Sequence, residues 1–82
     1  MNLQFTRQAK KDLAEFDRQD RNRIIATLYK LQSDPHSCDL KKLKGQSDMW
    51  RLRVGGIRVI LWDDKMAQIL YVMGVRPRKD AY

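Results

Sequence analysis

Met49-Trp50-Arg51-Leu52-Arg53-Val54-Gly55-Gly56-Ile57-Arg58-Val59-Ile60-Leu61-Trp62 is the stretch that decides the fold. Its two halves alternate apolar and polar side chains, and the Gly-Gly pair between them is a strong signal for a two-residue hairpin turn. We therefore predict two antiparallel strands with Arg53 opposite Arg58 and Leu52 opposite Val59. One face of this hairpin is apolar and must be buried, and the other face carries three arginines.

The polar face of the predicted hairpin brings together Arg51, Arg53 and Arg58. Like charges that face each other across a ladder are unfavourable, by roughly 0.2 to 1 kcal/mol. A guanidinium group offers a rigid fork of donors that matches phosphate oxygens, and it stays charged at any working pH. This face therefore favours a site for a phosphodiester backbone, and the alternative is a strand face that is simply solvated.

Length and charge restrict the class of protein. The chain has 82 residues, which indicates one domain over residues 1–82, and its net charge is +7. Such a charge suggests nucleic acid, an acidic protein or an anionic membrane as partner. Because we find no apolar run of about 18 residues and no signal-peptide pattern, we expect a cytoplasmic protein without a membrane contact. The single cysteine, Cys38, agrees, since it can form neither an internal disulfide nor a zinc site.

The N-terminal half predicts one strand and two helices. Asn2–Phe5 alternates and is expected to be a short strand before a helix cap at Thr6. Apolar residues at helical spacing predict a first helix from Arg7 to about Arg18 and a second helix that Asp20 caps and that ends before Pro35. The apolar stripe of the second helix consists of Ile24, Ile25, Leu28 and Leu31. This helical hairpin must lay its stripe against the apolar face of the β-hairpin.

The C-terminal half predicts a connection and a third long strand. Residues 33–46 contain turn formers and are interpreted mostly as connection, with a short turn near Leu40–Leu43 as an option. Residues 67–73 predict a strand, and pairing Trp62 with Ala67 would set Arg58 opposite Tyr71. The sequence leaves open which set faces the core, Leu70 and Val72 or Ile69, Tyr71 and Met73.

The order of these elements predicts the fold class. It is α+β, with an N-terminal strand, a helical hairpin and a three-stranded antiparallel meander, and both helices pack on one face of the sheet. Basic charge is concentrated in the sheet half, since residues 41–58 hold six basic residues and one acid. The lysines there are interpreted as electrostatic contacts to a phosphodiester backbone: Lys41, Lys42 and Lys44. By parity, Trp62 lies on the arginine face, where it can stack on a base or simply cover the sheet.

Four runs resemble a known superfamily: Lys42-Leu43-Lys44-Gly45, Trp50-Arg51-Leu52-Arg53-Val54, Ile57-Arg58-Val59-Ile60 and Gly74-Val75-Arg76-Pro77-Arg78-Lys79-Asp80-Ala81-Tyr82. They are similar to the RelE/ParE superfamily of bacterial type II toxin–antitoxin toxins, and the RelE-like branch is favoured. The resemblance implies an mRNA interferase that enters the ribosomal A site, cuts mRNA without a metal or cofactor and so inhibits translation. It also implies a cognate antitoxin that neutralises the toxin in a hetero-oligomer.

The resemblance also implies the residues of the site. The catalytic set falls on Arg51, Arg53, Arg58, Arg76 and Tyr82, and further RNA contacts fall on Lys42, Lys44, Arg78 and Lys79. The RelE pattern has lysines where this chain has its first two arginines, and arginine is a poor proton acceptor. The general base therefore stays open among Lys44, Tyr82 and the terminal carboxylate. Two alternatives also stay open, a ParE-like inhibitor of DNA gyrase and a basic RNA-binding module that cleaves nothing.

Overall fold

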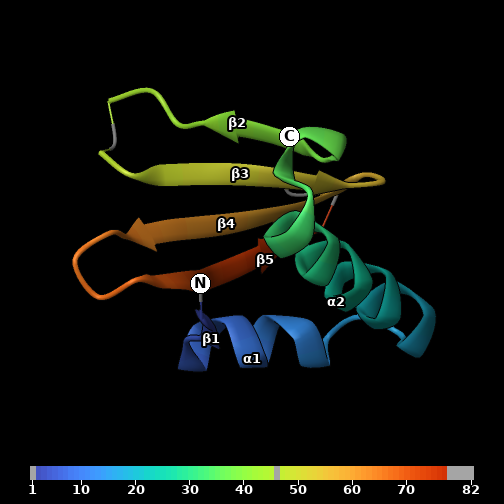
Figure 1. Cartoon of the computed structure of the whole chain (residues 1–82). Coiled ribbons are helices and arrows are strands. Elements are labelled where there is room, and N and C mark those ends of the chain that lie inside the picture. Colours follow the sequence, from blue (N-terminus) through green and yellow to red (C-terminus); the bar gives the residue numbers. More distant parts are fainter. Residues whose placement is uncertain (1, 46, 78–82) are drawn as a thin grey trace.

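The computed structural model describes residues 2–45 and 47–77. Its elements are β1 (Asn2–Phe5), α1 (Arg7–Ala14), α2 (Arg18–Ser33), the 3₁₀ turn η1 (Pro35–Ser37), β2 (Asp39–Lys42), β3 (Met49–Val54), β4 (Ile57–Asp64) and β5 (Ile69–Arg76). The strands form one sheet in the order β1-β5-β4-β3-β2 (Figure 1). Every neighbouring pair is antiparallel except β1 and β5, which run parallel. The predicted α+β architecture is confirmed.

Both helices begin at a side-chain cap. The Thr6 hydroxyl accepts a hydrogen bond from the Ala9 backbone N–H at 3.1 Å, and the Asp17 carboxylate accepts one from the Asp20 backbone N–H at 2.8 Å. The predicted cap at Asp20 is therefore wrong by three residues, and the first helix ends at Ala14 instead of near residue 18. The reason is that Asp17, as the N-cap of α2, has an extended backbone conformation. This extended residue interrupts the helical backbone and so separates α1 from α2.

The β3–β4 hairpin forms as its sequence predicts. Arg53 pairs with Arg58 and Leu52 with Val59, and the turn places Gly55 at φ 62°, a left-handed conformation that glycine adopts without strain. Side chains on one face are buried and those on the other are partly or fully exposed. The alternation of apolar and polar residues in the sequence thus corresponds to the core face and the opposite face of the hairpin.

The edge strand β2 contradicts the predicted connection over residues 33–46. Asp39–Lys42 pairs with β3 and places Leu40 opposite Leu52. Three of its four side chains are charged, which hides the strand in the sequence but is typical of edges, where charge discourages pairing with other chains. The strand forms because β3 offers it a ladder, which is a tertiary effect that local propensity does not report.

The β4–β5 register also differs from the predicted one. Trp62 pairs with Tyr71 and Arg58 with Arg76, because the connection occupies residues 65–68. The predicted pairings of Trp62 with Ala67 and of Arg58 with Tyr71 are therefore wrong. A bulge at Met73 shifts the ladder between Ile60 and Leu61, so that Leu70 and Val72 face the core before it and Val75 after it.

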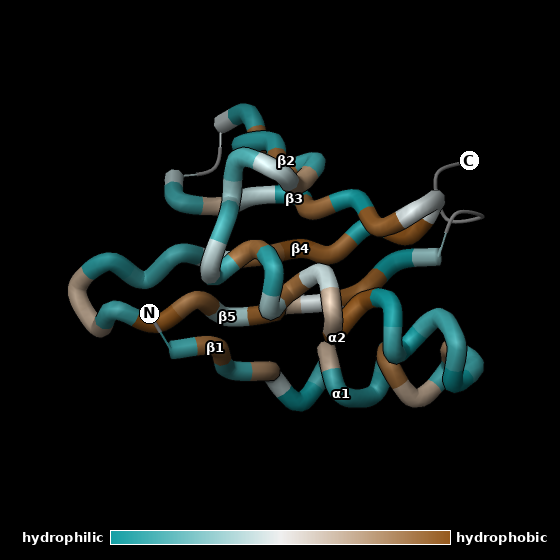
Figure 2. The backbone as a smooth tube through the Cα atoms, turned by 45° about the vertical axis from the view of Figure 1, so that its right-hand side comes forward, coloured by the Kyte–Doolittle hydropathy of each residue, from teal (hydrophilic) through white to brown (hydrophobic). Residues whose placement is uncertain are grey.

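The core lies between the two helices and one face of the sheet. Ile24 and Leu28 of α2 are completely buried, as are Leu52, Val59 and Leu61 of the sheet. Figure 2 shows the apolar colour concentrated along β3, β4 and β5, whereas the connections and much of α1 and α2 are hydrophilic. Among the described residues, neither α-helix has the length and hydropathy needed to cross a bilayer. Because both helices cover the same face of the sheet, the opposite face is available for a site.

Candidate functional site

Three arginines occupy facing positions on neighbouring strands. Arg53 of β3 pairs with Arg58 of β4, which in turn pairs with Arg76 of β5. We call these three residues the arginine row. Neighbouring strands lie about 4.8 Å apart, so the backbones of the row span roughly 10 Å. The row begins on the face opposite the core, because the residues next to it in sequence, Leu52 and Val59, are buried.

Arg51 lies on the same face, one position along, opposite Ile60. Its side chain is 15% exposed, and its Nη2 lies 3.4 Å from Oδ1 of Asp39. The Nε atoms of Arg51 and Arg58 are buried and have no hydrogen-bond partner within residues 2–45 and 47–77. A buried donor without a partner costs about 1 to 3 kcal/mol, and more when it is charged.

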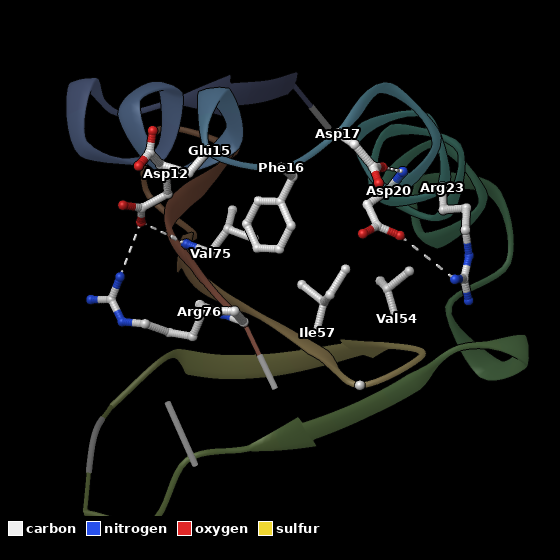
Figure 3. Close-up of a pocket in the computed structure, with 12 residues that line it drawn as sticks. Asp12, Glu15, Phe16, Asp17, Asp20, Arg23, Val54, Ile57, Val75 and Arg76 are labelled. Atoms are coloured by element: carbon white, nitrogen blue, oxygen red, sulfur yellow. Dashed lines mark hydrogen bonds and ion pairs between the residues drawn. The ribbon is translucent and has the colours of Figure 1, made fainter. Parts of the chain in front are cut away.

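The first two members of the row differ from the third in their surroundings. In the described part of the chain, no carboxylate lies within 4.0 Å of the guanidinium nitrogens of Arg53 or Arg58. The Nη1 of Arg76, in contrast, lies 3.0 Å from Oδ2 of Asp12, as Figure 3 shows. Arg76 therefore stands at the margin of the face, held by a carboxylate from α1.

The Asp12 carboxylate closes an open sheet edge. β1 ends opposite Val72, so on that side the rest of β5 has no neighbouring strand among the described residues. Here the Val75 N–H donates to Oδ2 of Asp12 at 2.9 Å, and the Thr6 hydroxyl donates to the Met73 carbonyl at 3.1 Å. Side chains from α1 and its cap thus replace the missing strand, and the same oxygen that accepts from the backbone also binds Arg76.

The pKa of Asp12 reflects these contacts. Burial by itself raises this pKa, but the hydrogen bonds from Val75 and Gln8 and the charge of Arg76 outweigh it, and the pKa is lowered from the ordinary 3.8. Gly74 makes the arrangement sterically feasible, since a Cβ there would lie 3.2 Å from both Nη1 of Arg76 and Oδ2 of Asp12. Sequence reasoning missed Asp12 because its partner is 64 residues away.

An acidic groove lies on the helix side, at the end of the sheet where the β3–β4 hairpin turns. It encloses about 850 Å³, and Figure 3 shows the side chains that surround it. Its acidic residues are Asp12, Glu15, Asp17 and Asp20, and its apolar residues include Phe16, Val54, Ile57 and Val75. Within the described residues, no three His, Cys, Asp or Glu side chains are placed to hold a metal ion. This groove also escaped the sequence analysis, because α1, α2 and the β-strands that line it are distant in sequence.

The predicted lysines lie toward the other edge of the sheet. Lys41 pairs with Arg51 and shares its face, whereas Lys42 pairs with Trp50. A hollow of about 980 Å³ is lined by basic residues from this region: Lys41, Lys42, Lys44 and Arg51. The Leu43 N–H donates to the Met49 carbonyl, and Lys44 lies one residue further on. About 17 Å along the strand direction therefore separates its position from Arg53. Arg78, Lys79 and Tyr82 lie outside the described residues.

Comparisons with known proteins identify the family. The family model described as "ParE toxin of type II toxin-antitoxin system, parDE" matches residues 3–82. RelE1 of Methanocaldococcus jannaschii, named as a candidate toxin, is 28% identical over 87 residues, and the match covers 99% of this chain and 93% of that protein.

Solved structures agree. A RelB-RelE antitoxin-toxin complex from Methanococcus jannaschii contains a chain with a TM-score of 0.80 and 26% identity, covering 95% of this chain and 93% of that one. The intact E. coli RelBE toxin-antitoxin complex gives a TM-score of 0.76 at 21% identity, covering 93% of this chain and 94% of that one, which shows a shared fold. With a family model that spans nearly its whole length, this chain belongs to the ParE toxin family of type II toxin–antitoxin systems, within the RelE/ParE superfamily.

Proposed function

We propose that this protein is the toxin of a RelBE-type module and that it cleaves mRNA in the ribosomal A site. The observation that carries the proposal is the open face of the sheet, where Arg53 and Arg58 face each other and no carboxylate of the described residues lies within 4.0 Å of their guanidinium nitrogens. Asp39, which pairs with Arg53 across β2 and β3, binds Arg51 instead. Two facing cations repel each other unless a polyanion binds between or above them. RNA is the polyanion that the similarity to RelE proteins favours.

The proposed reaction is an in-line transesterification. The ribose 2′-oxygen attacks the adjacent phosphorus, a new P–O2′ bond forms and the P–O5′ bond breaks. The products are a 2′,3′-cyclic phosphate and a free 5′-hydroxyl. A base takes the proton from the 2′-hydroxyl, and the departing 5′-oxygen gains a proton. Negative charge on the phosphoryl oxygens rises on the way to the transition state, so cations fixed beside those oxygens lower the barrier.

The geometry suggests a role for each arginine. Arg53 and Arg58 are proposed to bind the oxygens of the reacting phosphate, and Arg51 to bind the neighbouring phosphate. Arg76 is proposed to bind near the leaving oxygen or a second phosphate, positioned from the edge by Asp12. Because Lys44 lies about 17 Å from Arg53 along the strand direction, we favour Tyr82 or the terminal carboxylate as the general base. Tyr82 can also stack on a nucleobase.

A cognate antitoxin is the proposed protein partner. The solved relatives include a RelB-RelE complex and the E. coli RelBE complex, which supports a hetero-oligomer for this chain as well. An antitoxin segment that covers the arginine row would exclude RNA from it, and acidic side chains would suit that surface. We propose that toxin and antitoxin act in the cytoplasm, where the ribosome and mRNA are found.

One specific observation favours a different target. The family model that matches residues 3–82 is that of ParE toxins, whose branch inhibits DNA gyrase and lacks the nuclease residues. On that hypothesis the arginine row would contact gyrase or its DNA and would carry out no reaction. A basic module that binds RNA without cleaving it is the third candidate.

Primer extension on mRNA in a translation reaction in vitro separates these candidates. We expect wild-type protein to produce cuts at A-site codons and Arg58→Ala to produce none. Arg7→Ala is the matched control, because it removes the same charge from an exposed position on α1. Intact mRNA together with blocked supercoiling by gyrase would instead establish the ParE-like function, and RNA binding without either effect would establish the third candidate.

A further inference from the structure

The open face of the sheet continues beyond the arginine row to an aromatic pair. Trp62 of β4 pairs with Tyr71 of β5, and their rings stack with centroids 5.4 Å apart and planes 17° from parallel. Trp62 is 36% exposed although it is a large apolar side chain. It lies four residues from Arg58 on the same strand and therefore on the same face.

The distance along this face suits a single strand of nucleic acid. Four residues of β-strand span about 13 Å, which a few nucleotides can cover. Between the two ends lies Arg51, which pairs with Ile60, and Lys41 extends the same row to β2. A chain of phosphates that starts at the arginine row thus meets further cations on its way to the aromatic pair.

We propose that Trp62 and Tyr71 form a base-stacking subsite for single-stranded RNA, next to the phosphate site of the arginine row. This inference rests on the proposed function, since it takes RNA as the molecule bound at the row. Aromatic rings on an open sheet, flanked by cations, bind unpaired bases because every base has a π face. Such stacking tolerates different sequences, so the subsite would add affinity and register while the arginines bind the backbone.

A structural role is the competing explanation. Cross-strand aromatic pairs stabilise sheets without any ligand. Trp62 is partly exposed, and the pair lies on the arginine face, whereas the core is built on the opposite face of the sheet. Both observations favour a ligand-binding role over a purely structural one. A protein segment that covers the same rings is the second competitor, and it would bind whether or not RNA can.

Intrinsic fluorescence can report on this subsite directly. The chain has two tryptophans, and Trp50 packs against the core, so Trp50→Phe leaves Trp62 as the single reporter. We would titrate this full-length variant with a short single-stranded RNA that is 2′-O-methylated throughout, because it cannot cyclise and stays intact. The inference predicts quenching of Trp62 on binding and a change in affinity when one nucleotide at a time is made abasic.

The variants then separate stacking from folding. Trp62→Ala should weaken binding of the methylated RNA roughly 5- to 150-fold, and Trp62→Phe should keep most of the affinity. Moreover, Trp62→Ala should lose the sensitivity to the abasic position. Tyr29→Ala is the matched control, since Tyr29 is an aromatic residue of α2 that is 63% exposed, and it should bind like wild type. Circular dichroism checks that each variant is folded.

The outcomes distinguish this inference from the proposed function. If folded Trp62→Ala binds the RNA like wild type, or if only a polypeptide partner and no RNA quenches Trp62, the subsite is overturned. In either case, loss of cleavage in Arg58→Ala would still support the proposed nuclease function. If instead RNA quenches the fluorescence of Trp62 and no substitution in the arginine row affects cleavage, the stacking subsite is supported and the proposed catalytic site is contradicted.

Discussion

Arg58 and Arg76 face each other across β4 and β5, yet their surroundings differ. Arg58 has a buried Nε without a partner and no carboxylate of the described residues within reach, whereas Arg76 is bound by Asp12. The same side chain thus serves two purposes in adjacent strands. We expect the arginine without an ion pair to bind an anion, and the arginine paired with Asp12 to stabilise the edge of the sheet. Four substitutions test this contrast.

Arg58→Ala should have the largest effect, and this effect should be on activity. Removing one fixed cation from a phosphoryl transition state raises the barrier by about 3 to 4 kcal/mol. The free protein should lose no stability, because no ion pair of the described residues is lost. Relief of the repulsion from Arg53 should stabilise it by about 0.2 to 1 kcal/mol. Single-turnover cleavage on programmed ribosomes and urea unfolding measure the two quantities. A marked loss of stability in this variant would show that Arg58, like Arg76, contributes to the structure of the sheet.

Asp12→Ala should affect stability. Asp12 is 14% exposed, and its loss leaves the Val75 N–H and Arg76 without their acceptor, at a cost of about 1 to 3 kcal/mol. Asp12→Asn should lose less, because an amide oxygen can still accept from the backbone. Glu15→Gln is the control, since Glu15 is exposed in the same groove. Equal unfolding free energies for Asp12→Ala and wild type would show that the edge does not need this carboxylate.

The pH dependence of stability should show the charge of Asp12. Because folding lowers the pKa of this carboxyl, its contribution is fully present above the ordinary value of 3.8 and declines as the pH falls through the lower pKa of the folded state. The difference in unfolding free energy between wild type and Asp12→Asn should therefore shrink at acid pH. A difference that stays constant from neutral pH to about pH 2.5 would contradict this expectation.

Arg53→Ala should produce a small effect on folding, opposite in sign to that of Asp12→Ala. It relieves the repulsion from Arg58 and should stabilise the free protein by about 0.2 to 1 kcal/mol, while RNA cleavage falls. Added salt should reduce this gain, because exposed charges are screened. Urea unfolding at low and high ionic strength measures it. Destabilisation at low salt would mean that Arg53 contributes packing that outweighs the repulsion.

Local sequence patterns predicted those parts of the fold that depend on residues close together in the sequence. Gly55-Gly56 and the alternation around it predicted the β3–β4 register, and with it the common face of Arg51, Arg53 and Arg58. The helical stripes predicted two helices and their buried side, although not where the first one ends. The superfamily was also predicted, from motifs that lie mostly in the last forty residues.

Long-range features could not be predicted in the same way. The strand at Asp39–Lys42 exists because β3 lies beside it, and the bulge at Met73 changes which residues of β5 face the core. The contact of Asp12 with Arg76 depends on α1 lying along an edge that β1 leaves free. None of these has a signature in its own short stretch of sequence. The assignment of roles to the arginines and to Tyr82 stays a prediction until the variants are measured.

The parallel pairing of β1 with β5 has a consequence for biosynthesis. The residues of β1, made first, find their ladder partner in Ile69–Val72, which the ribosome makes near the end of the chain. A nascent polypeptide that stops before β5 has neither Arg76 nor the strand that joins β1 to β4. Since pairing between distant segments forms late in folding, an incomplete product would be inactive. The arginine row is therefore complete only after β5 has been synthesised and has paired with β4.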